Sequence, residues 1–359
     1  MNPVSIAVAS ERATYRVLVG RGLAARPAEW LPADEGVRVV VSCPPVRRAL
    51  GRTMQRLTPG APAVMIADGE RAKSLRTVAR LYDAFLARRL DRSGAVIAVG
   101  GGVVGDVAGF AAATYLRGVP LIHIPTTLLA QVDSSVGGKV GVNLAAGKNL
   151  VGAFHPPALV VCDPDVLASL PRREFRAGMF EVVKYGVIAS RGLFDRVSAN
   201  LERLLAQDQR ELPEVIAECC RIKAAVVSQD EREGGPRRVL NFGHTVGHAL
   251  EGLTGYRRFR HGEAVAYGML AAARLSARRG ALTAADEARL QDVIRRLGRL
   301  PPVADLRASR ALDYISRDKK VVRGRLNFVL ARGLGATEIV ADVTAAELSA
   351  AMRSVGLRA

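Results

Sequence analysis

The chain has 359 residues, which predicts about two domains because a single hydrophobic core rarely grows beyond roughly 250–300 residues. Its 49% apolar composition is sufficient for a packed core, but no stretch matches the roughly 20 apolar residues of a membrane-spanning helix. The formal charge of +18 comes from scattered arginines, without the blocks of like charge or the aromatic residues that favour nucleic-acid binding. Because the N-terminus also lacks the apolar core of a signal peptide, we expect a cytoplasmic protein that binds neither membrane nor nucleic acid.

The first part of the chain alternates strand-like and helical patterns. Strand-like runs read TYRVLVG, VRVVVS, APAVMIAD and GAVIAVG, and an amphipathic helical pattern covers residues 75–89. This alternation predicts βαβ units and an α/β domain with a parallel sheet and flanking helices. Residues 100–105 are predicted as a turn, and a helix is predicted to begin at Asp106.

Helical patterns dominate the second part of the chain. They cover residues 175–190, 212–229, 261–280 and 284–298, and only residues 325–333 again resemble a strand. The change in pattern predicts an α/β domain at residues 1–168 and a mostly helical domain at residues 169–359.

Two turns that follow predicted strands are candidate phosphate-binding sites. GGGVVGD at residues 100–106 has the spacing G-x-G-x-x-G, which allows a backbone to approach a pyrophosphate at a helix N-terminus. The acidic residue usually found about 20 positions later is missing, so a standard dinucleotide fingerprint is not predicted. The alternative for this turn is a role in packing only. Asp68, Gly69 and Glu70, with Lys73, follow another strand and could equally form an ordinary turn.

Several lysines have positions that suggest an anion site. Lys139 and Lys148 each follow a glycine within residues 125–149, so a phosphate or carboxylate could reach both backbone N–H groups and ammonium groups. The alternative is two exposed turns. Glu181 and Lys184 lie three residues apart on a predicted helix, facing either one cleft or solvent as a surface ion pair. His123, in an apolar strand, is interpreted as structural, and the four cysteines as buried free thiols.

The stretch RRVLNFGHTVGHALEGLTGYRRFRHGE, at residues 237–263, holds three of the five histidines. His244 and His248 lie four residues apart, so they share one face of a helix, and His261 follows a loop. Three imidazoles could supply the three protein ligands typical of a catalytic zinc site. The alternative is a helix whose histidines are solvated or cap the core.

Taken in order, the motifs GGGVVGD, PTTLLAQVDSSVGGK, GKN, LPRREFRAGMFEVVK, RIK, LNFGHTVGH, HGE and DKK resemble the 3-dehydroquinate synthase family. The resemblance extends from about residue 15 to residue 328. It implies an N-terminal nucleotide-binding domain, a helical metal-binding domain and an active site in the cleft between them. It also implies a homodimer that binds NAD and Zn²⁺ or Co²⁺. The implied reaction converts 3-deoxy-D-arabino-heptulosonate 7-phosphate into 3-dehydroquinate and phosphate, within the shikimate pathway.

The resemblance also implies a role for individual residues. The implied metal ligands are Glu181, His244 and His261, while His248 is an acid/base residue that faces the substrate. Implied substrate contacts are Lys139, Lys148, Asn149, Lys184, Lys223, Arg237, Asn241 and either Lys319 or Lys320, with Arg117 supplied to the partner's active site. Implied nucleotide contacts are Asp68, Gly69, Glu70, Lys73, Gly102, Val103, Val104, Gly105, Asp106, Thr126, Thr127, Lys139, Lys148 and Ser169.

The chain departs from the family pattern in two places. Residues 41–45, VSCPP, lack the Asp and Asn that many members direct toward the adenosine, and residues 188–190 lack the usual I-x-D. Three alternative functions remain open. They are a related sugar phosphate cyclase, a metal-dependent polyol dehydrogenase that would accumulate NADH, and a basic binding protein without enzymatic activity.

Overall fold

The computed structural model describes residues 3–11, 13–31, 36–316, 321–322 and 325–359. The chain divides into two compact units, the first formed by Met1–Pro171 with Leu212–Arg232, and the second by Arg172–Glu211 with Glu233–Ala359. The first boundary lies close to the predicted change at residue 168. Helix α7 (Glu211–Gln229), which the sequence analysis placed in the second domain, groups almost entirely with the first unit. Buried contacts explain this grouping, since the Cys220 thiol donates to the Gln131 carbonyl at 3.3 Å.

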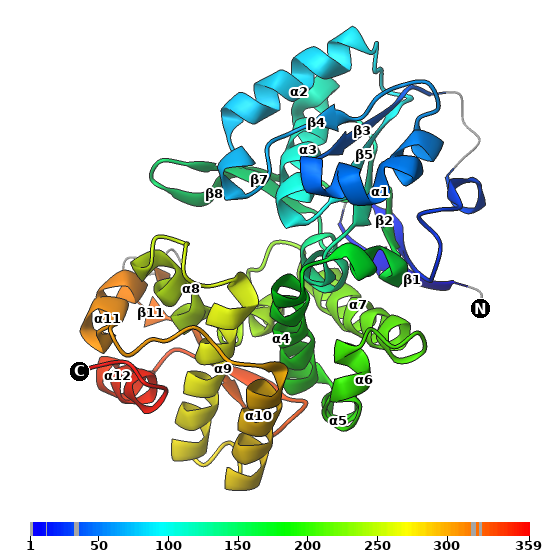
Figure 1. Ribbon diagram of the computed structural model, residues 1–359. Helices are drawn as coiled ribbons and strands as arrows, with labels where there is room; N and C mark the ends of the chain where they lie inside the picture. Colours follow the sequence, from blue (N-terminus) through cyan, green and yellow to red (C-terminus); the bar gives the residue numbers. More distant parts are fainter. Residues whose placement is uncertain (1–2, 12, 32–35, 317–320, 323–324) are drawn as a thin grey trace. The chain divides into compact units, whose positions relative to one another are not determined.

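A seven-stranded sheet forms the centre of the first unit, in the order β1-β2-β9-β6-β5-β3-β4 (Figure 1). Its strands are β1 (Val4–Ala9), β2 (Thr14–Val19), β3 (Arg38–Ser42), β4 (Val64–Met65), β5 (Ala95–Gly100), β6 (Leu121–Pro125) and β9 (Leu159–Cys162). All neighbouring strands from β2 across the sheet to β4 pair in parallel, in the order β2-β9-β6-β5-β3-β4, which confirms the predicted sheet. The edge strand β1 is antiparallel to β2. The carboxyl ends of β4, β5 and β6 therefore lie at one edge of the sheet.

Helices cover both faces of this sheet. One face packs against α2 (Leu75–Ala87) and α3 (Gly102–Thr114), and the other against α1 (Pro44–Leu57). Helix α3 begins at Gly102 and not at Asp106, so the predicted helix start was wrong. The glycine-rich sequence looks like a turn, but Gly100 ends β5, Gly101 is an extended N-cap, and helical geometry begins at Gly102. The shorter segments of this unit are η1 (Pro27–Glu29), η2 (Glu70–Ala72), η3 (Tyr115–Arg117), η4 (Ala130–Ser134) and η5 (Pro164–Ser169).

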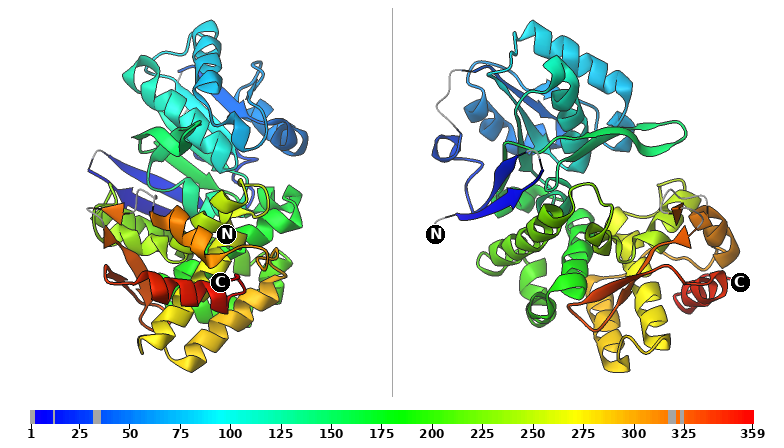
Figure 2. Two further views of the ribbon diagram at one scale, coloured as in Figure 1. Left: turned by 90° about the vertical axis from the view of Figure 1, so that its left-hand side faces the viewer. Right: turned by 180° about the vertical axis from the view of Figure 1, so that it is seen from behind.

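A β-hairpin extends from the first unit and carries both glycine–lysine pairs. It consists of β7 (Lys139–Leu144) and β8 (Gly147–Phe154), and it projects beyond the sheet in Figure 1 and in the right-hand view of Figure 2. These two strands were not predicted from the sequence. Lys139 begins β7, and Lys148 lies in β8 directly after the hairpin turn.

The second unit is mostly helical, as predicted. Its helices are α4 (Arg172–Ala189), α5 (Arg191–Ala199), α6 (Leu201–Leu205), η6 (Pro236–Asn241), α8 (His244–Leu253), α9 (His261–Arg278), α10 (Ala284–Leu297), α11 (Ala308–Ser316) and α12 (Ala345–Ser354). Two short antiparallel pairs complete it, β10 (Val321–Val322) with β11 (Arg325–Leu326), and β12 (Phe328–Ala331) with β13 (Thr337–Val340). Among the described helices of the whole chain, none has the length and apolarity needed to cross a bilayer.

Two glycines allow α9 to approach its neighbours closely. A Cβ atom at Gly262 would lie 1.9 Å from the Ala177 carbonyl oxygen, and one at Gly268 would lie 1.7 Å from that of Gly243. Ala177 belongs to α4, and Gly243 directly precedes α8. The absence of side chains at these two positions therefore allows α4, α8 and α9 to meet.

Replacing Gly268 by alanine is expected to destabilise the protein by roughly 1–3 kcal/mol or more, because the added methyl group collides with backbone. Chemical denaturation of the purified variant would measure the loss. Gly192→Ala is the matched control, since within the described part of the chain the nearest atom to a Cβ there is the Ser190 Oγ, at 4.0 Å. Equal midpoints for the two variants would contradict the expectation.

Candidate functional site

Three imidazoles gather where α8 and α9 begin. His244 is the first residue of α8, and His261 is the first residue of α9. The ring centroids of His244 and His261 are 5.1 Å apart, and His248 lies 5.3 Å from His244 and 5.8 Å from His261. One ligand atom from each histidine lies within 4.8 Å of the other two. Of the two sequence-based interpretations, the clustered geometry favours a metal site.

Glu181, on α4, places a buried carboxylate against two of these histidines. Its side chain is 0% exposed, and its Oε1 lies 3.8 Å from His244 Nε2 and 3.7 Å from His261 Nε2. Within the described part of the chain, neither oxygen of Glu181 has a hydrogen-bond partner, although Lys184 Nζ forms an ion pair with Oε2. A buried carboxylate is costly unless a cation or donors compensate for lost hydration. Bonds of about 2.0–2.2 Å to a tetrahedral ion place ligand atoms about 3.4 Å apart, so a divalent metal fits here with small adjustments.

Hydrogen bonds orient two of the imidazoles. His244 Nδ1 lies 3.1 Å from the Phe242 carbonyl oxygen, and His261 Nδ1 lies 3.2 Å from Glu251 Oε2. A carbonyl and an ionised carboxylate can only accept, so each Nδ1 carries the proton and, in the neutral ring, each Nε2 keeps its lone pair. This is the arrangement that metal-binding histidines usually have.

Glu251 is a residue that the sequence analysis missed. It is buried, and it lies on α8 three residues after His248 and seven after His244. These spacings place all three side chains on one helix face, so the periodicity of the motif could have identified it.

The predicted substrate contacts of the second unit are mostly buried. Lys184 and Arg237 are 1% and 2% exposed, respectively, and Asn241 donates its amide to the Glu233 carboxylate. Because Glu181 and Lys184 are both buried, the alternative of a surface ion pair is wrong. Glu233 was also missed.

In the first unit, the predicted nucleotide contacts cluster at the carboxyl edge of the sheet. Residues of η2 follow β4, the N-terminus of α3 follows β5, and Thr126 and Thr127 follow β6. A Cβ atom at Gly101 would lie 2.9 Å from Thr127 Cγ2, and one at Gly102 would lie 3.0 Å from Ser134 Oγ. Glycine therefore keeps this helix start clear of side chains. The first N–H groups of a helix lack intrahelical acceptors, so the N-terminus of α3 suits a pyrophosphate.

A polar network joins predicted nucleotide contacts to the hairpin. Lys73 Nζ lies 2.5 Å from Asp106 Oδ2 and 2.5 Å from Asn149 Oδ1, and Lys148 Nζ lies 3.7 Å from Glu70 Oε1. Burial raises the pKa of the Asp106 carboxyl, and the neighbouring Lys73 ammonium opposes that shift. The structure therefore brings Glu70, Lys73, Asp106, Lys148 and Asn149 together.

Lys223, on α7, also belongs to the first unit. Its Nζ lies 2.6 Å from the Asp133 carbonyl oxygen and 2.5 Å from Asp133 Oδ1, in η4. The side chain of Lys223 is 6% exposed and that of Asp133 is 26% exposed. This ion pair places a nearly buried cation against η4, which precedes the hairpin.

Other predicted residues have different surroundings. Val104 is buried in the core, so only its backbone can serve a ligand, and Ser169 is exposed and donates to the Val166 carbonyl within η5. Arg117 is exposed and has φ +66°, next to Leu116 with φ +49°. Asp68 is exposed on the loop before η2, which Gly69 enters with φ +84°. Lys319 and Lys320 lie outside the described residues.

The departures from the family pattern serve local structure. Ser42 Oγ donates to the Val99 carbonyl, and Pro44 begins α1. Ser190 caps α5 by accepting from the Leu193 N–H group. His123 is buried and its pKa is lowered to about 4 by burial, in agreement with its structural interpretation. The four cysteines are free and buried, as expected.

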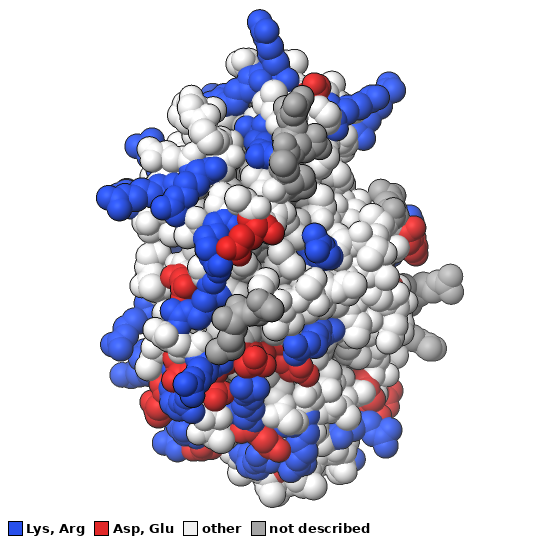
Figure 3. Space-filling view, turned by 90° about the vertical axis from the view of Figure 1, so that its right-hand side faces the viewer, with Lys and Arg blue, Asp and Glu red and all other residues white. Residues whose placement is uncertain are grey.

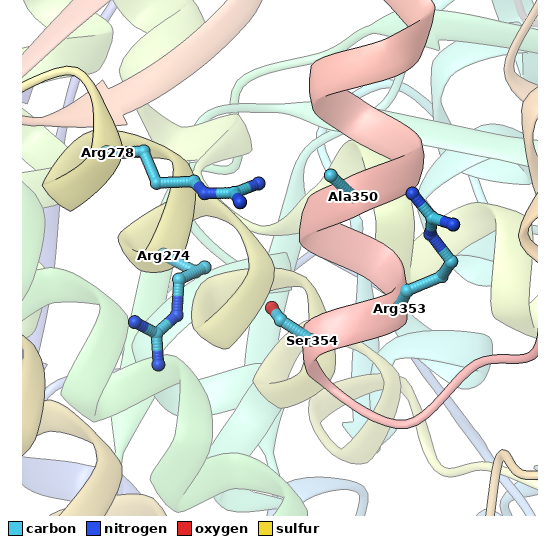
Figure 4. A pocket seen from close by; sticks show the side chains of 5 residues that line it. All are labelled: Arg274, Arg278, Ala350, Arg353 and Ser354. Carbon is cyan, nitrogen blue, oxygen red and sulfur yellow. The ribbon is translucent and has the colours of Figure 1, made fainter.

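Basic side chains do not form one patch on the face in Figure 3, where acidic residues are interspersed with many of them. A cavity of about 520 Å³ between α9 and α12 is lined by Arg274, Arg278, Ala350, Arg353 and Ser354. Figure 4 shows the three guanidinium groups pointing in different directions, and Arg274 pairs with Glu287 at 3.0 Å. This cavity contains no predicted site residue, so we do not assign the substrate to it.

Family models match most of the chain. The model of the N-terminal part of 3-dehydroquinate synthase matches residues 63–177, and the model of its C-terminal part matches residues 178–321. The chain belongs to the 3-dehydroquinate synthase family. It is 44% identical to the 3-dehydroquinate synthase of Solibacter usitatus, over 98% of this chain and 99% of that relative.

Two solved structures resemble this member of the family. A 2-epi-5-epi-valiolone synthase from Streptomyces hygroscopicus subsp. jinggangensis, with NAD⁺ and Zn²⁺ bound, is 31% identical at a TM-score of 0.87, covering 97% of this chain and 98% of that chain. A 2-deoxy-scyllo-inosose synthase complexed with carbaglucose-6-phosphate, NAD⁺ and Co²⁺ is 27% identical at a TM-score of 0.87. That match covers 98% of this chain and 100% of the other.

Glu251→Gln is expected to weaken metal binding by about 10- to 100-fold, because a neutral amide holds the His261 ring less firmly and lowers its basicity. Competition with a chromophoric chelator would measure the change. Glu287→Gln is the matched control, since Glu287 is also buried but pairs with Arg274. Unchanged affinity in the Glu251 variant would contradict a role in supporting the metal.

Proposed function

We propose that this family member is a 3-dehydroquinate synthase, which converts 3-deoxy-D-arabino-heptulosonate 7-phosphate into 3-dehydroquinate and phosphate. The observation that carries the proposal is the 44% identity to a synthase of that name over nearly the full length of both chains. The buried carboxylate–imidazole cluster and the glycine-rich helix start are the two sites that such a reaction needs.

Glu181, His244 and His261 are the proposed metal ligands, and the N-terminus of α3 with η2 is the proposed NAD site. The burial of the Glu181 carboxylate, whose oxygens have no hydrogen-bond partner among the described residues, supports Glu181 over His248 as the third ligand. Glu181 Oε1 lies 3.8 Å from His244 Nε2 and 3.7 Å from His261 Nε2, and this carboxylate is fully buried, while a ring nitrogen of His248 also lies within 4.8 Å of the other two. When bound, the metal would supply Lewis acidity toward substrate hydroxyl groups, and NAD would supply reversible hydride transfer without net redox change.

Protein side chains bind the substrate and manage its protons. In the second unit, His248 is the proposed acid/base residue, with Lys184, Arg237 and Asn241 as substrate contacts. Lys139, Lys148, Asn149 and Lys223 are the proposed contacts from the first unit. Ammonium and guanidinium groups bind the phosphate and carboxylate of the substrate, and they stabilise negative charge as phosphate leaves. Either Lys319 or Lys320 completes the proposed set.

The proposed reaction requires residues of both units to act on one substrate molecule. The full set of proposed nucleotide contacts is Asp68, Gly69, Glu70, Lys73, Gly102, Val103, Val104, Gly105, Asp106, Thr126, Thr127, Lys139, Lys148 and Ser169.

We also propose a cytoplasmic homodimer in which Arg117 reaches the partner's site. The paired positive φ angles at Leu116 and Arg117 support a functional role for this turn, because such strain persists where structure enforces it.

A related sugar phosphate cyclase is the less favoured alternative. The solved cyclases with other products are 31% and 27% identical, compared with 44% for the synthase from Solibacter. A polyol dehydrogenase would differ in accumulating NADH.

Purified protein with NAD⁺ and Zn²⁺ is expected to release phosphate from the heptulosonate phosphate without net NADH formation. Phosphate and absorbance at 340 nm, the NADH band, would be followed together. Sedoheptulose 7-phosphate serves as the competing substrate. Turnover of sedoheptulose 7-phosphate alone would sink the proposal, as would NADH accumulating in step with product.

Substitutions of the candidate ligands distinguish the two possible ligand sets, which are His244 and His261 with either Glu181 or His248. His261→Ala is expected to abolish metal binding and activity, because both sets include this residue. His248→Ala is expected to keep the metal and lose about 100-fold or more in kcat, the scale of general acid–base catalysis. Metal content and kcat would be measured for both, with Glu181→Gln for comparison. Loss of metal from His248→Ala together with full retention in Glu181→Gln would establish the histidine triad instead.

A further inference from the structure

The β7–β8 hairpin contains an irregularity centred on Asn143. Leu144 pairs with Gly147 near the turn, but Val142 pairs with Val151, so the register shifts between these pairs. Asn143 alone on β7 therefore lies opposite Lys148, Asn149 and Leu150 on β8. Extra residues of this kind leave backbone groups without ladder partners.

The Asn143 side chain compensates for this irregularity. Its Oδ1 accepts a hydrogen bond from the Asn149 N–H group at 2.9 Å, and its Nδ2 donates to Glu70 Oε1 at 2.8 Å. The Asn143 backbone N–H group also donates to the Lys73 carbonyl at 2.9 Å. A primary amide suits this position because it has both a donor and an acceptor.

These bonds hold the turn in one conformation. Asn149 has φ +51°, a left-handed conformation that a non-glycine residue adopts only when its surroundings favour it. The Asn149 side chain accepts from Lys73 Nζ at 2.5 Å, and Lys148 Nζ lies 3.7 Å from Glu70. Two proposed substrate contacts, Lys148 and Asn149, thus contact two proposed nucleotide contacts, Glu70 and Lys73. Asn143 forms hydrogen bonds with Glu70, Lys73 and Asn149.

We propose that Asn143 is a positioning residue that couples nucleotide binding to the placement of the substrate-binding turn. The proposal rests on the proposed function. A nucleotide that engages Glu70 and Lys73 fixes the residues to which Asn143 is bonded, and Asn143 then fixes the backbone at Asn149. Because coupling is reciprocal, the ordered turn also strengthens nucleotide binding.

The test exchanges the donor and the acceptor of the hydrogen bond between residues 143 and 70. Asn143→Asp keeps an acceptor for the Asn149 N–H group but replaces the donor to Glu70 with a second carboxylate. Adding Glu70→Gln supplies a donor from the other side. Asn143→Asp alone is expected to weaken NAD⁺ binding and raise the substrate KM, each by about tenfold, because hydrogen bonds to charged groups contribute about 1.5–3 kcal/mol. We expect kcat to change less, since Asn143 positions a binding turn.

In the Glu70→Gln background, adding Asn143→Asp is expected to change the NAD⁺ affinity and the substrate KM by less than about twofold. The reason is that the glutamine can donate the hydrogen bond between positions 70 and 143. NAD⁺ affinity would be measured by calorimetry on the full chain with Zn²⁺. Asn200→Asp is the matched control, since among the described residues its side-chain amide donates to the Arg196 carbonyl, outside both proposed sites. The same loss from Asn143→Asp in both backgrounds would overturn the proposal.

Hydrogen exchange separates this proposal from the proposed function. NAD⁺ is expected to slow exchange of the Asn149 amide in the wild-type protein and to have a smaller effect in Asn143→Asp. This measurement needs no turnover, so it can succeed even where heptulosonate phosphate is not a substrate. Equal protection by NAD⁺ in both proteins would overturn the coupling, whatever the assay shows.

Discussion

A carboxylate removed from water is the constraint on which the second unit depends. Glu181 is 0% exposed, and burying its charge costs several kcal/mol unless nearby positive charge or a metal compensates. Lys184 compensates on one side, and the Nε2 atoms of His244 and His261 face the other. The glycines of α9 let this helix pack closely against α4 and the start of α8, which brings the three side chains together. Glu251 and the Phe242 carbonyl then determine how the two rings face Glu181.

In the first unit, backbone N–H groups are proposed to bind the negative charge of the cofactor. Its proposed cofactor site depends on open N–H groups at the start of α3, which side chains at Gly101 and Gly102 would obstruct. Lys73 forms a charged pair with Asp106 of α3, and the same lysine donates to Asn149 of the hairpin. A nucleotide and a sugar phosphate are both anions, so placing the proposed lysines of both sites in one network gives a physical basis for coupling their binding.

Local patterns predicted much of this architecture. Alternating strand and helix patterns identified the parallel sheet, and apolar periodicity identified α4, α7, α9 and α10. The start of α3 was predicted too late because glycines usually indicate turns. The hairpin was missed because its glycines and lysines suggested loops. Helical periodicity also does not show what a helix packs against, so the grouping of most of α7 with the first unit had no signal in the sequence.

The candidate site shows the same limit. The spacing of His244 and His248 predicted a shared helix face, but not that Glu181 would be buried beside His244 and His261. A spacing of three residues between Glu181 and Lys184 suits a solvated ion pair and a buried pair equally, and only tertiary packing distinguishes them. Contacts between distant segments, such as Glu70 with Asn143 or Lys223 with Asp133, have no local pattern at all.

The central claim is that Glu181, and not His248, completes a metal shell with His244 and His261. X-ray absorption at the zinc edge of the Zn²⁺-loaded protein tests it most directly, because imidazole rings produce a distinct multiple-scattering pattern. The account predicts two imidazole ligands, with oxygen in the remaining positions, and the same imidazole number in His248→Ala. Three imidazoles in the wild-type protein, reduced to two in His248→Ala, would contradict it.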